Sequence, residues 1–455
     1  MSLQPEDPFV RVVLLNYNGG ELILRAVAAA AATEWPQNRI QIVCVDNGSS
    51  DGSVDEIASK YPDVHIVRNG RNLGFPGNNV AMEDLEGVDY VALVNSDAFV
   101  EPNWLRKLVT RAEADRTLGA VCPKILFTGE FVGFRVDLRG TSNSSPQMIR
   151  LRSLTVNGRD EFGRCHVARG GGRSSDSEGI FEWIADGSIL RFPIATDFEN
   201  DSIVLKVGLQ IDDACEVTIG GTTAQFVGAR EQQTVSFVID QIPQRVAVLN
   251  NVGSWIDHSW TGHERGLFMV DDGEFDRPME VGAWCGAAVL LRSSMLEDIG
   301  LFDDAYFLYY EDTDLAVRGR ERGWRYMTEP TSRVFHDHSS STVEGSELAA
   351  FHIERNRLMF AVRHAPSGVA INVLWRFLLV TASYTLSELR RAVRESRRFD
   401  GTVVFRRLHS LFGFVRELPN ALRVRKSLSR RRLVSDRELA EAILMGGASS
   451  GSKGD

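Results

Sequence analysis

Cysteine is scarce in this sequence, and its few cysteines form neither a disulfide pattern nor a zinc pattern. An odd number of them, Cys44, Cys122, Cys165, Cys215 and Cys285, is spread over the whole chain. Small secreted domains carry closely spaced, even sets of cysteine, and structural zinc sites need paired ones. The pattern therefore predicts a reduced, cytosolic protein without a structural zinc ion.

Long hydrophobic runs are also few. Pro5, Glu6 and Asp7 stand where a secretory signal needs a basic segment and an apolar core. The longest apolar stretch near the C-terminus, residues 369–386, is interrupted by Asn372 and Arg376, and we expect it to fall short of a membrane-spanning helix. We therefore predict a cytoplasmic protein, with peripheral contact at the inner face of the cell membrane left open.

Two signatures of phosphate binding are missing from the glycine-bearing segments before residue 80. Neither Gly-x-Gly-x-x-Gly nor Gly-Lys-Ser/Thr occurs there, which disfavours a dehydrogenase or a kinase. What is present is a series of apolar segments, at 10–15, 40–45, 64–67 and 90–94, each followed by Gly, Asn or Asp. Such segments suit buried parallel strands, and ligands bind beyond the carboxyl ends of such strands. The pattern predicts a nucleotide pocket in a doubly wound α/β domain.

The segment Asn95-Ser96-Asp97 follows the last of these predicted strands. A hard cation such as Mg²⁺ or Mn²⁺ accepts one or two carboxylates together with substrate phosphates, so Asp97 can hold one against a diphosphate. Asn95 would then donate a hydrogen bond. The alternative is an ordinary turn in which Asn95 and Asp97 cap the helix that begins around Pro102.

A second acidic segment crowds Glu311, Asp312 and Asp314 together where a helix is predicted to begin near Thr313. In a dry pocket the repulsion between these carboxylates raises at least one pKa, unless cations or helix amides offset it. A carboxylate placed here can remove the proton from an acceptor hydroxyl. The alternative is that Asp312 only caps the helix.

The chain resembles the inverting, GT-A-fold glycosyltransferases of family 2, and within them the rhamnosyltransferase-like branch. The resemblance rests on Val-Leu-Leu-Asn-Tyr-Asn-Gly (13–19), Val-Asp-Asn-Gly-Ser-Ser-Asp-Gly-Ser (45–53), Asn-Leu-Gly-Phe-Pro-Gly-Asn-Asn (72–79), Asn-Ser-Asp (95–97), Trp-Cys-Gly-Ala-Ala (284–288), Gly-Leu-Phe-Asp-Asp (300–304), Phe-Leu-Tyr-Tyr-Glu-Asp-Thr-Asp-Leu (307–315) and Arg-Asn-Arg-Leu (355–358). These segments fall in residues 9–127 and 248–365, in the family's order.

This resemblance implies a role for each matching residue. Asp312 matches the catalytic base, and Asp97 and His336 match the metal ligands, with His338 as the alternative histidine. Asn95 replaces the first aspartate of the family's metal motif. The expected donor contacts are Asn16, Asn18, Asp46, Asn47, Asn78, Asn95, Ser96 and Asp97, and the expected acceptor contacts are Trp284 and Glu311. The implied cofactor is a divalent cation, and the implied substrates are a nucleoside-diphosphate sugar and a glycan or lipid-linked acceptor.

The family pattern is interrupted in the middle of the chain, which predicts several domains. We expect a catalytic domain formed by 1–127 and 248–365, an inserted antiparallel β-sandwich at 128–247, a basic helical region at 366–445, and a disordered tail at 446–455. The sandwich is predicted from period-two alternation, for example at 202–207 and 215–219. A flexible loop is expected at 170–175. The insert either grips the acceptor glycan, through Phe181, Trp183 and Phe192, or is a structural or oligomerising element.

The net charge of −10 conceals an asymmetry. Residues 363–445 contain 17 Arg and Lys against 7 Asp and Glu, a balance of +10, so the remainder of the chain carries −20. With apolar residues interleaved, this region can lie on an anionic bilayer, or pack on the catalytic domain or in a homo-oligomer. The acidic remainder argues against nucleic-acid binding.

Two other functions compete with sugar transfer. A nucleotidyltransferase would use a similar α/β domain with a metal-binding aspartate, but no basic, Gly-rich phosphate loop is present at its start. A catalytically weak carbohydrate-binding protein is the second rival, and Asn95 is its main support. For the donor sugar, the resemblance favours rhamnose carried on deoxythymidine diphosphate.

Overall fold

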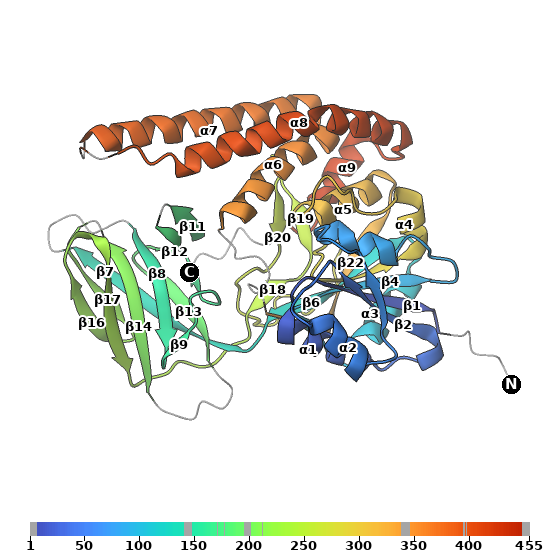
Figure 1. Ribbon diagram of the computed structural model, residues 1–455, viewed down its shortest axis with the longest axis horizontal. Coiled ribbons are helices and arrows are strands. Elements are labelled where there is room, and N and C mark those ends of the chain that lie inside the picture. The colour runs from blue at the N-terminus through green and yellow to red at the C-terminus, as the bar shows by residue number, and fades with distance from the viewer. Residues whose placement is uncertain are drawn as a thin grey trace.

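The structure is a computed structural model that describes residues 7–140, 148–170, 172–176, 178–194, 202–211, 213–337, 346–394, 396 and 398–447. Figure 1 shows an α/β domain, a β-sandwich beside it, and long helices laid across one end of both. The predicted fold class is confirmed, because a mixed, mostly parallel sheet is accompanied by antiparallel sheets and C-terminal helices.

The central sheet has the strand order β3-β2-β1-β4-β21-β6-β22-β5, with β18 paired to β6. Its strands are β1 (Val10–Asn16), β2 (Ile40–Asp46), β3 (His65–Arg68), β4 (Tyr90–Asn95), β5 (Ala98–Val100), β6 (Leu118–Phe127), β18 (Leu249–Asn251), β21 (Ala288–Arg292) and β22 (Arg325–His336). Strands β1 to β4 are parallel, as are β6 and β22, whereas β21 runs antiparallel to β4 and β6. All of β6 and nearly all of β4 is buried, as strands covered on both faces require.

Helices cover both faces of this sheet. They are α1 (Gly20–Ala31), α2 (Ser53–Lys60), α3 (Trp104–Ala114), α4 (Ser293–Ile299), α5 (Glu311–Glu321) and α6 (Glu347–His364), with short 3-10 helices η1 (Gln37–Arg39) and η2 (Phe75–Ala81). One core packs α1, α2 and α3 on one face, and a second packs α4, α5 and α6 on the other. A small hairpin, β19 (Ser254–Ile256) and β20 (Gly262–Glu264), lies beside the second core.

The segment between β6 and β18 forms two antiparallel sheets that share one core. The first has the order β10-β13-β7-β15-β16 and the second β11-β12-β8-β14-β17, with β9 paired to β8. The bounds are β7 (Glu130–Gly140), β8 (Ile149–Val156), β9 (Arg159–Asp160), β10 (His166–Ala168), β11 (Gly172–Asp176), β12 (Gly179–Ile184), β13 (Ser188–Ile194), β14 (Ile203–Ile211), β15 (Cys215–Ile219), β16 (Thr222–Phe226) and β17 (Ala229–Ile239). Alternate residues of β15 are buried, which is the periodicity that predicted the sandwich.

Two details of the insert differ from the sequence-based expectation. The loop expected at 170–175 is wrong, because Gly172–Asp176 is strand β11, hydrogen-bonded along β12. The proposed stacking faces are also largely unavailable for glycan. Phe192 is fully buried in the sandwich core and Phe181 is buried against Trp183, which itself lies half-buried beneath Arg150. Period-two alternation assigns a side chain to one face of a strand, but which face meets the second sheet is a tertiary property.

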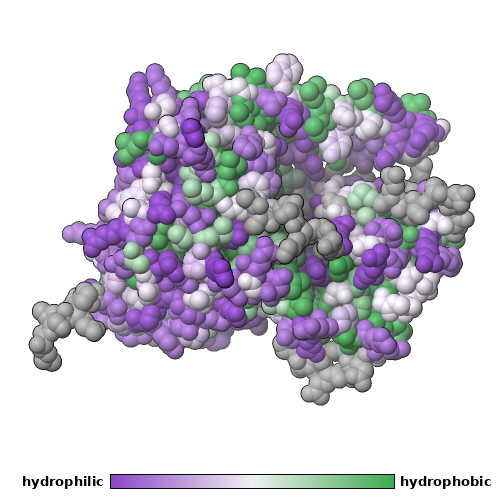
Figure 2. Space-filling view, turned by 180° about the vertical axis from the view of Figure 1, so that it is seen from behind, coloured by the Kyte–Doolittle hydropathy of each residue, from purple (hydrophilic) through white to green (hydrophobic). Residues whose placement is uncertain are grey.

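The C-terminal helices are α7 (Ser367–Arg394), α8 (Thr402–Arg431) and α9 (Asp436–Ile443). Within the described residues, one helix, α7, is long and apolar enough to cross a membrane by length and composition, so the expectation that this stretch is too short was wrong. Figure 2 shows hydrophobic side chains interspersed with hydrophilic ones along the upper edge, where α7 and α8 lie. Of the predicted disordered tail, Gly447 packs near Trp255, and residues 448–455 lie outside the described residues.

Candidate functional site

The polar segments after β1, β2 and β4 meet at one edge of the central sheet. Asn16 is in register with Asp46, and the neighbouring Leu15 is in register with Asn95. Because these strands are parallel, their carboxyl ends form a common rim. The predicted nucleotide-binding segments are therefore adjacent in space.

Three of the expected donor contacts, all buried asparagines, hold the loops of this rim. Asn16 Oδ1 accepts a hydrogen bond from the Gly19 amide at 3.0 Å. Asn47 Nδ2 donates to the Gly74 carbonyl at 2.8 Å, which ties the loop after β2 to the segment after β3. Asn78 Nδ2 donates within its own 3-10 helix. These side chains therefore hold the backbone of the loops at this rim.

Asn18 and Asp46 are placed differently. Asn18 is exposed, has a left-handed backbone with φ of 52°, and accepts from the Ser50 amide through Oδ1 at 2.8 Å. Asp46 is buried, and its Oδ1 accepts from the Ser49 amide at 2.9 Å. Both side chains thus join the loop after β2 to the edge where a nucleoside would bind.

Asp97 and His336, far apart in sequence, are brought together by the pairing of β5 with the end of β22. Ala98 is the register partner of His336, and the Asp97 Oδ1 atom lies 3.1 Å from His336 Nε2. Both side chains are buried. The other ring nitrogen, Nδ1, lies 3.0 Å from Asn250 Oδ1, an acceptor that requires the proton to be on Nδ1.

This pair fits a divalent cation. A proton on Nδ1 alone would leave the Nε2 lone pair and the Asp97 carboxylate oxygen, 3.1 Å apart, to share one bound cation. The 3.1 Å separation is close to that of adjacent ligands, each about 2.1 Å from one ion. In the described part of the chain no three His, Cys, Asp or Glu side chains gather as a metal site, so phosphate oxygens and water would have to complete the shell. His338 lies outside the described residues.

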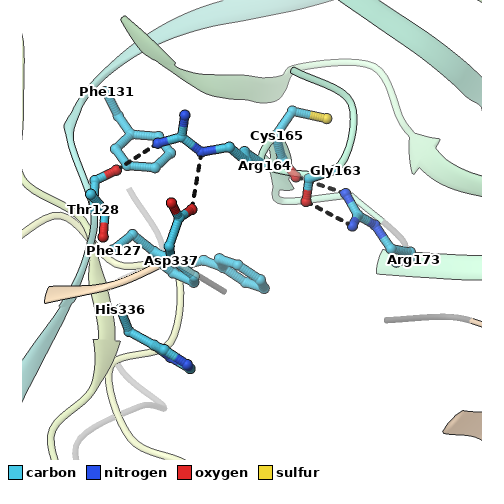
Figure 3. A pocket seen from close by; sticks show the side chains of 10 residues that line it. Phe127, Thr128, Phe131, Gly163, Arg164, Cys165, Arg173, His336 and Asp337 are labelled. Atoms are coloured by element: carbon cyan, nitrogen blue, oxygen red, sulfur yellow. Dashed lines mark hydrogen bonds and ion pairs between the residues drawn. The ribbon is translucent and has the colours of Figure 1, made fainter. Parts of the chain in front are cut away.

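A hollow lined by His336, of about 350 Å³ with open solvent included, lies between the catalytic domain and the insert (Figure 3). Arg164 of the insert reaches across it. Its Nη2 donates to the Thr128 carbonyl at 2.9 Å, and its Nε lies 3.5 Å from Asp337 Oδ1. Thr128 and Asp337 directly follow the ends of β6 and β22, so Arg164 links the insert to the strand end that carries His336.

The Asp312 carboxylate lies at the start of α5, which begins at Glu311, two residues before the expected start. Its Oδ2 accepts from the Gly286 amide at 3.0 Å, and its Oδ1 accepts from the Thr313 amide at 2.6 Å. The side chain is half-buried, and burial raises its pKa above the ordinary carboxyl value while these amides oppose the rise. Asp312 does not cap α5, for which no side-chain cap is present.

The pKa values of the two neighbouring acids, Glu311 and Asp314, are shifted in opposite directions, and the upward shift of Glu311 agrees with the expected repulsion. Burial and the charges of Asp312 and Asp314 raise the pKa of Glu311 well above its usual value, which favours its neutral form. Asp314 lies 2.9 Å from Arg318 Nε and 2.9 Å from His364 Nε2, and these cations hold its pKa below the usual range despite burial. Asp314 is thus a structural anchor, whereas the Asp312 carboxyl is held by the backbone amides of Gly286 and Thr313.

A short series of bonds connects Asp312 with the segment that carries Asp97. Gly286, which holds the Asp312 carboxylate, precedes Ala287, whose carbonyl accepts from the Asn95 amide at 2.9 Å. Strand β21, which follows, pairs Ala288 with Val94 at the end of β4. The candidate base and the candidate metal ligand are therefore at the same edge of the sheet.

The loop before α5 has a strained backbone, and hydrogen bonds from helix α6 hold it in place. Phe307, Tyr309 and Tyr310 all have left-handed backbones, with φ of 54°, 66° and 72°. Such conformations cost about 1 kcal/mol or more each in residues other than glycine. The fully buried Asn356 on α6 donates through Nδ2 to the carbonyls of Tyr306, Leu308 and Tyr309 at 2.9, 2.8 and 2.7 Å. Asn356 therefore fixes the approach to Asp312, a role that sequence reasoning missed.

Replacing Asn356 with leucine should lower the free energy of unfolding by about 3 kcal/mol, because it leaves buried carbonyls without a donor. Denaturant unfolding followed by circular dichroism measures this. The same change at the exposed helical Asn372 is the control, with an expected effect within about 0.5 kcal/mol. Equal stability of the two variants would contradict the role given to Asn356.

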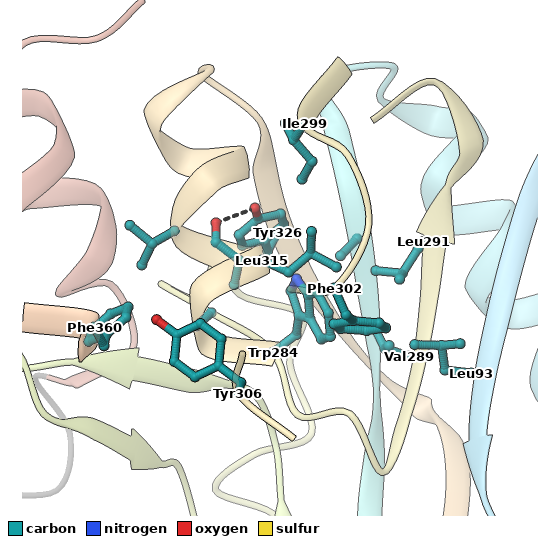
Figure 4. Packing of buried hydrophobic residues seen from close by; sticks show 14 of the residues in the cluster. Leu93, Trp284, Val289, Leu291, Ile299, Phe302, Tyr306, Leu315, Tyr326 and Phe360 are labelled. Carbon is teal, nitrogen blue, oxygen red and sulfur yellow. Dashed lines mark hydrogen bonds between the residues drawn. The ribbon is translucent and has the colours of Figure 1, made fainter. Parts of the chain in front are cut away.

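Trp284, an expected acceptor contact, is not presented at this edge. Its side chain is 1% exposed and packs with Phe302 in the core beneath α5 (Figure 4). The neighbouring Gly286 is the residue that serves the site, because a side chain there would collide with the ring of Phe75. In this segment Gly286, and not Trp284, contacts the candidate base.

Comparison with known proteins gives a family for this arrangement. Residues 11–172 match the family model described as Glycosyl transferase family 2. The N-acetylglucosaminyl-diphospho-decaprenol L-rhamnosyltransferase of Mycobacterium tuberculosis H37Rv is 37% identical over 126 residues, which is 27% of this chain and 39% of that protein. The glycosyltransferase AglE of Haloferax volcanii is 26% identical over 107 residues, 23% of this chain and 35% of that protein. The chain thus spans about two fifths of the length of the curated relatives it matches.

Solved structures are similar to the chain only at low identity and low TM-score. The mannosyltransferase PcManGT of Pyrobaculum calidifontis, in complex with GDP-Man and Mn²⁺, is 14% identical with a TM-score of 0.40 and covers 91% of this chain and 88% of its own. GalNAc-T7 with UDP, GalNAc and Mn²⁺ is 13% identical with a TM-score of 0.42, covering 79% of this chain and 51% of its own. The similarity to a family therefore comes from sequence: residues 11–172 match the glycosyl transferase family 2 model, and part of the chain is similar to an L-rhamnosyltransferase.

Proposed function

We propose that this chain is an inverting glycosyltransferase. It moves a sugar, for which we propose rhamnose, from a nucleoside diphosphate to a hydroxyl of a bacterial cell-surface glycan or lipid-linked saccharide. The observation that carries the proposal is the position of Asp312, whose carboxyl group is held by the Gly286 amide beside the strand end that leads to Asp97. The name of the mycobacterial relative supports both the rhamnosyl donor and the lipid-linked acceptor.

In the proposed reaction Asp312 takes the proton of the acceptor hydroxyl. As that oxygen bonds to C1 of the donor sugar, the C1 bond to the diphosphate breaks, and the nucleoside diphosphate leaves with the electron pair. A single displacement inverts the configuration at C1. Asp312 is suited to this step because burial raises its pKa, which makes its carboxylate a stronger base than an exposed one. Burial also raises the pKa of the neighbouring Glu311, which disfavours a second negative charge at the same place.

The residues proposed to hold the divalent cation are Asp97 and His336. When bound, such a cation offsets the negative charge that gathers on the departing diphosphate. Asn250 Oδ1 orients His336 by accepting a hydrogen bond from its Nδ1–H group, and we propose Asp46 and Asn18 as contacts to ribose and base. The proposed location is the cytoplasm, at the inner face of the cell membrane, where a lipid-linked acceptor is available.

Donor hydrolysis measured over a panel of UDP-, GDP- and dTDP-sugars, with and without Mn²⁺, tests this function. Release of nucleoside diphosphate from one donor, dependent on Mn²⁺, is the expected result. Release of pyrophosphate from a nucleoside triphosphate would instead indicate a nucleotidyltransferase. Glycan binding without turnover of any donor would indicate a carbohydrate-binding protein.

Asn250 gives a specific test of the metal site. Asn250→Leu should weaken Mn²⁺ binding roughly 10- to 100-fold, because a metal-binding histidine loses affinity when its second nitrogen loses its partner. Calorimetric titration of Mn²⁺ in the presence of UDP or dTDP measures the change, with thermal melting as the control for folding. Unchanged Mn²⁺ affinity in a folded variant would exclude His336 as a ligand oriented in this way.

A further inference from the structure

We infer that the outer face of the α7–α8 helix pair docks in the plane of an anionic lipid membrane. The inference concerns a surface away from the sugar-transfer site. It rests on the proposed function only for the lipid-linked acceptor that such a membrane would present.

The outer face of α7 carries a continuous apolar stripe. It consists of Ile371, Trp375, Leu379, Leu386, Leu389 and Val393, whose spacings of three, four and seven place them on one side of a helix. Their exposed fractions run from 46% for Leu389 to 81% for Val393. The opposite side carries Val373, Phe377 and Thr381, which are buried against the protein. The stripe is therefore an unpartnered apolar face.

A second stripe runs along α8, which lies beside α7 (Figure 1). It consists of Phe405, Leu408, Phe412, Val415 and Leu422, again at helical spacings, with exposed fractions from 48% to 69%. The buried side of α8 packs on α6, where the Ser410 hydroxyl lies 3.1 Å from Glu354 Oε2. The exposed apolar residues of both helices thus stand in rows at helical spacing, unlike the singly scattered apolar residues usual on a soluble monomer.

The helix pair is bound to the catalytic domain in a way that favours lying on a bilayer over crossing it. Only 17% of the most apolar window of α7 is buried, so α7 is not the core helix of a soluble domain. Yet Arg407 of α8 donates to the Thr381 hydroxyl at 2.8 Å and to the Phe377 carbonyl at 3.1 Å. The same guanidinium pairs with Glu354 of α6 at 3.0 Å. To cross a bilayer, α7 would have to leave these charged contacts.

The positive charge of the α7–α8 surface favours an anionic membrane as its binding partner. Exposed basic residues, among them Arg376 and Arg390 on α7 and Arg416 and Arg423 on α8, accompany the two stripes. A second copy of this chain would bring two arginine-rich surfaces together, which like-charge repulsion disfavours. An anionic bilayer instead attracts the basic groups at its headgroups and accepts the apolar stripes at the headgroup boundary, where Trp375 is a favourable anchor.

Vesicle sedimentation with the full-length protein tests the inference. Binding is expected to vesicles of phosphatidylcholine with phosphatidylglycerol, and much less to phosphatidylcholine alone. Replacing both Trp375 and Leu379 with glutamate should lower the partition coefficient at least about tenfold, because two large apolar side chains no longer enter the boundary. Arg376→Gln and Arg390→Gln should each lower it roughly fivefold and only on the anionic vesicles.

The matched control places glutamate at Val227 and Val238, apolar residues of the sandwich that are 68% and 52% exposed. This variant should bind vesicles as the unaltered protein does. Failure of the unaltered protein to bind anionic vesicles would overturn the inference, as would equal losses in the stripe and control variants. A stripe variant that turns a dimer into a monomer in sedimentation velocity, without any vesicle binding, would overturn it in favour of a second copy. Donor hydrolysis measured in parallel separates this outcome from a failure of the proposed function.

Discussion

Asp312→Asn is expected to lower the rate of sugar transfer roughly 10²- to 10⁴-fold, the usual contribution of a positioned general base. An amide cannot take the hydroxyl proton, whereas the carbonyl oxygen of asparagine can still accept from the amide of Thr313 or Gly286. The affinity for the nucleoside-diphosphate sugar should be nearly unchanged. Steady-state transfer rates and calorimetric donor binding together measure this separation of binding from turnover.

Asp304→Asn is the control for this variant, because Asp304 is an exposed acid of the same loop. It should leave transfer unchanged. A near-normal rate in a folded Asp312→Asn protein would remove Asp312 from the role of base.

Transfer must also decline as the pH falls through the pKa of Asp312. Since burial raises that pKa, the acid limb of the profile of kcat/KM should lie above about 3.9, the value for a free aspartate.

Asp97→Ala is expected to abolish the Mn²⁺-dependent part of donor binding, with a loss of roughly 100-fold or more in affinity for the metal–nucleotide complex. The reason is geometric. Asp97 is the carboxylate 3.1 Å from His336 Nε2, and removing it leaves one protein ligand at this position. Titration of UDP, GDP or dTDP into the protein with and without Mn²⁺ measures the difference.

The exposed Asp63, replaced by alanine, serves as the control for overall charge. It should leave the metal dependence intact. If nucleotide binds Asp97→Ala equally well with and without Mn²⁺, and with the affinity of the unaltered protein, the proposed metal site is wrong. Metal dependence that disappears in Asp97→Ala while His336→Ala retains it would indicate that the second ligand is another residue.

Much of the catalytic domain could be predicted because its elements depend on local patterns. The apolar segments at 10–15, 40–45 and 90–94 form strands β1, β2 and β4 with shifts of a residue at their ends. The acidic segment around Asp312 marks a helix start, and the expected electrostatic conflict is present in the raised pKa of Glu311. These features need only spacing and residue type, which a sequence displays directly.

Contacts between distant segments could not be predicted in the same way. Asn250 meets His336, and Asn356 of the Arg-Asn-Arg-Leu segment holds the loop before α5, but spacing and residue type indicate neither contact. Trp284, Phe181 and Phe192 were expected to face ligands, but hydrophobic burial placed them in cores. An aromatic side chain is equally suited to stacking on a sugar and to filling a core, and only its neighbours decide.

Local patterns in the sequence predict the α/β class, the order of strands along the chain, the interruption by a β-sandwich, and the residue types available for metal binding and proton transfer. Folding alone brings Asp97 to His336, ties Asp312 through Gly286 to the end of β4, and leaves the apolar stripes of α7 and α8 exposed. Periodicity and composition act over only a few residues. Which faces are buried, and which carboxylates are neutralised, depends on packing between segments that are far apart in the chain.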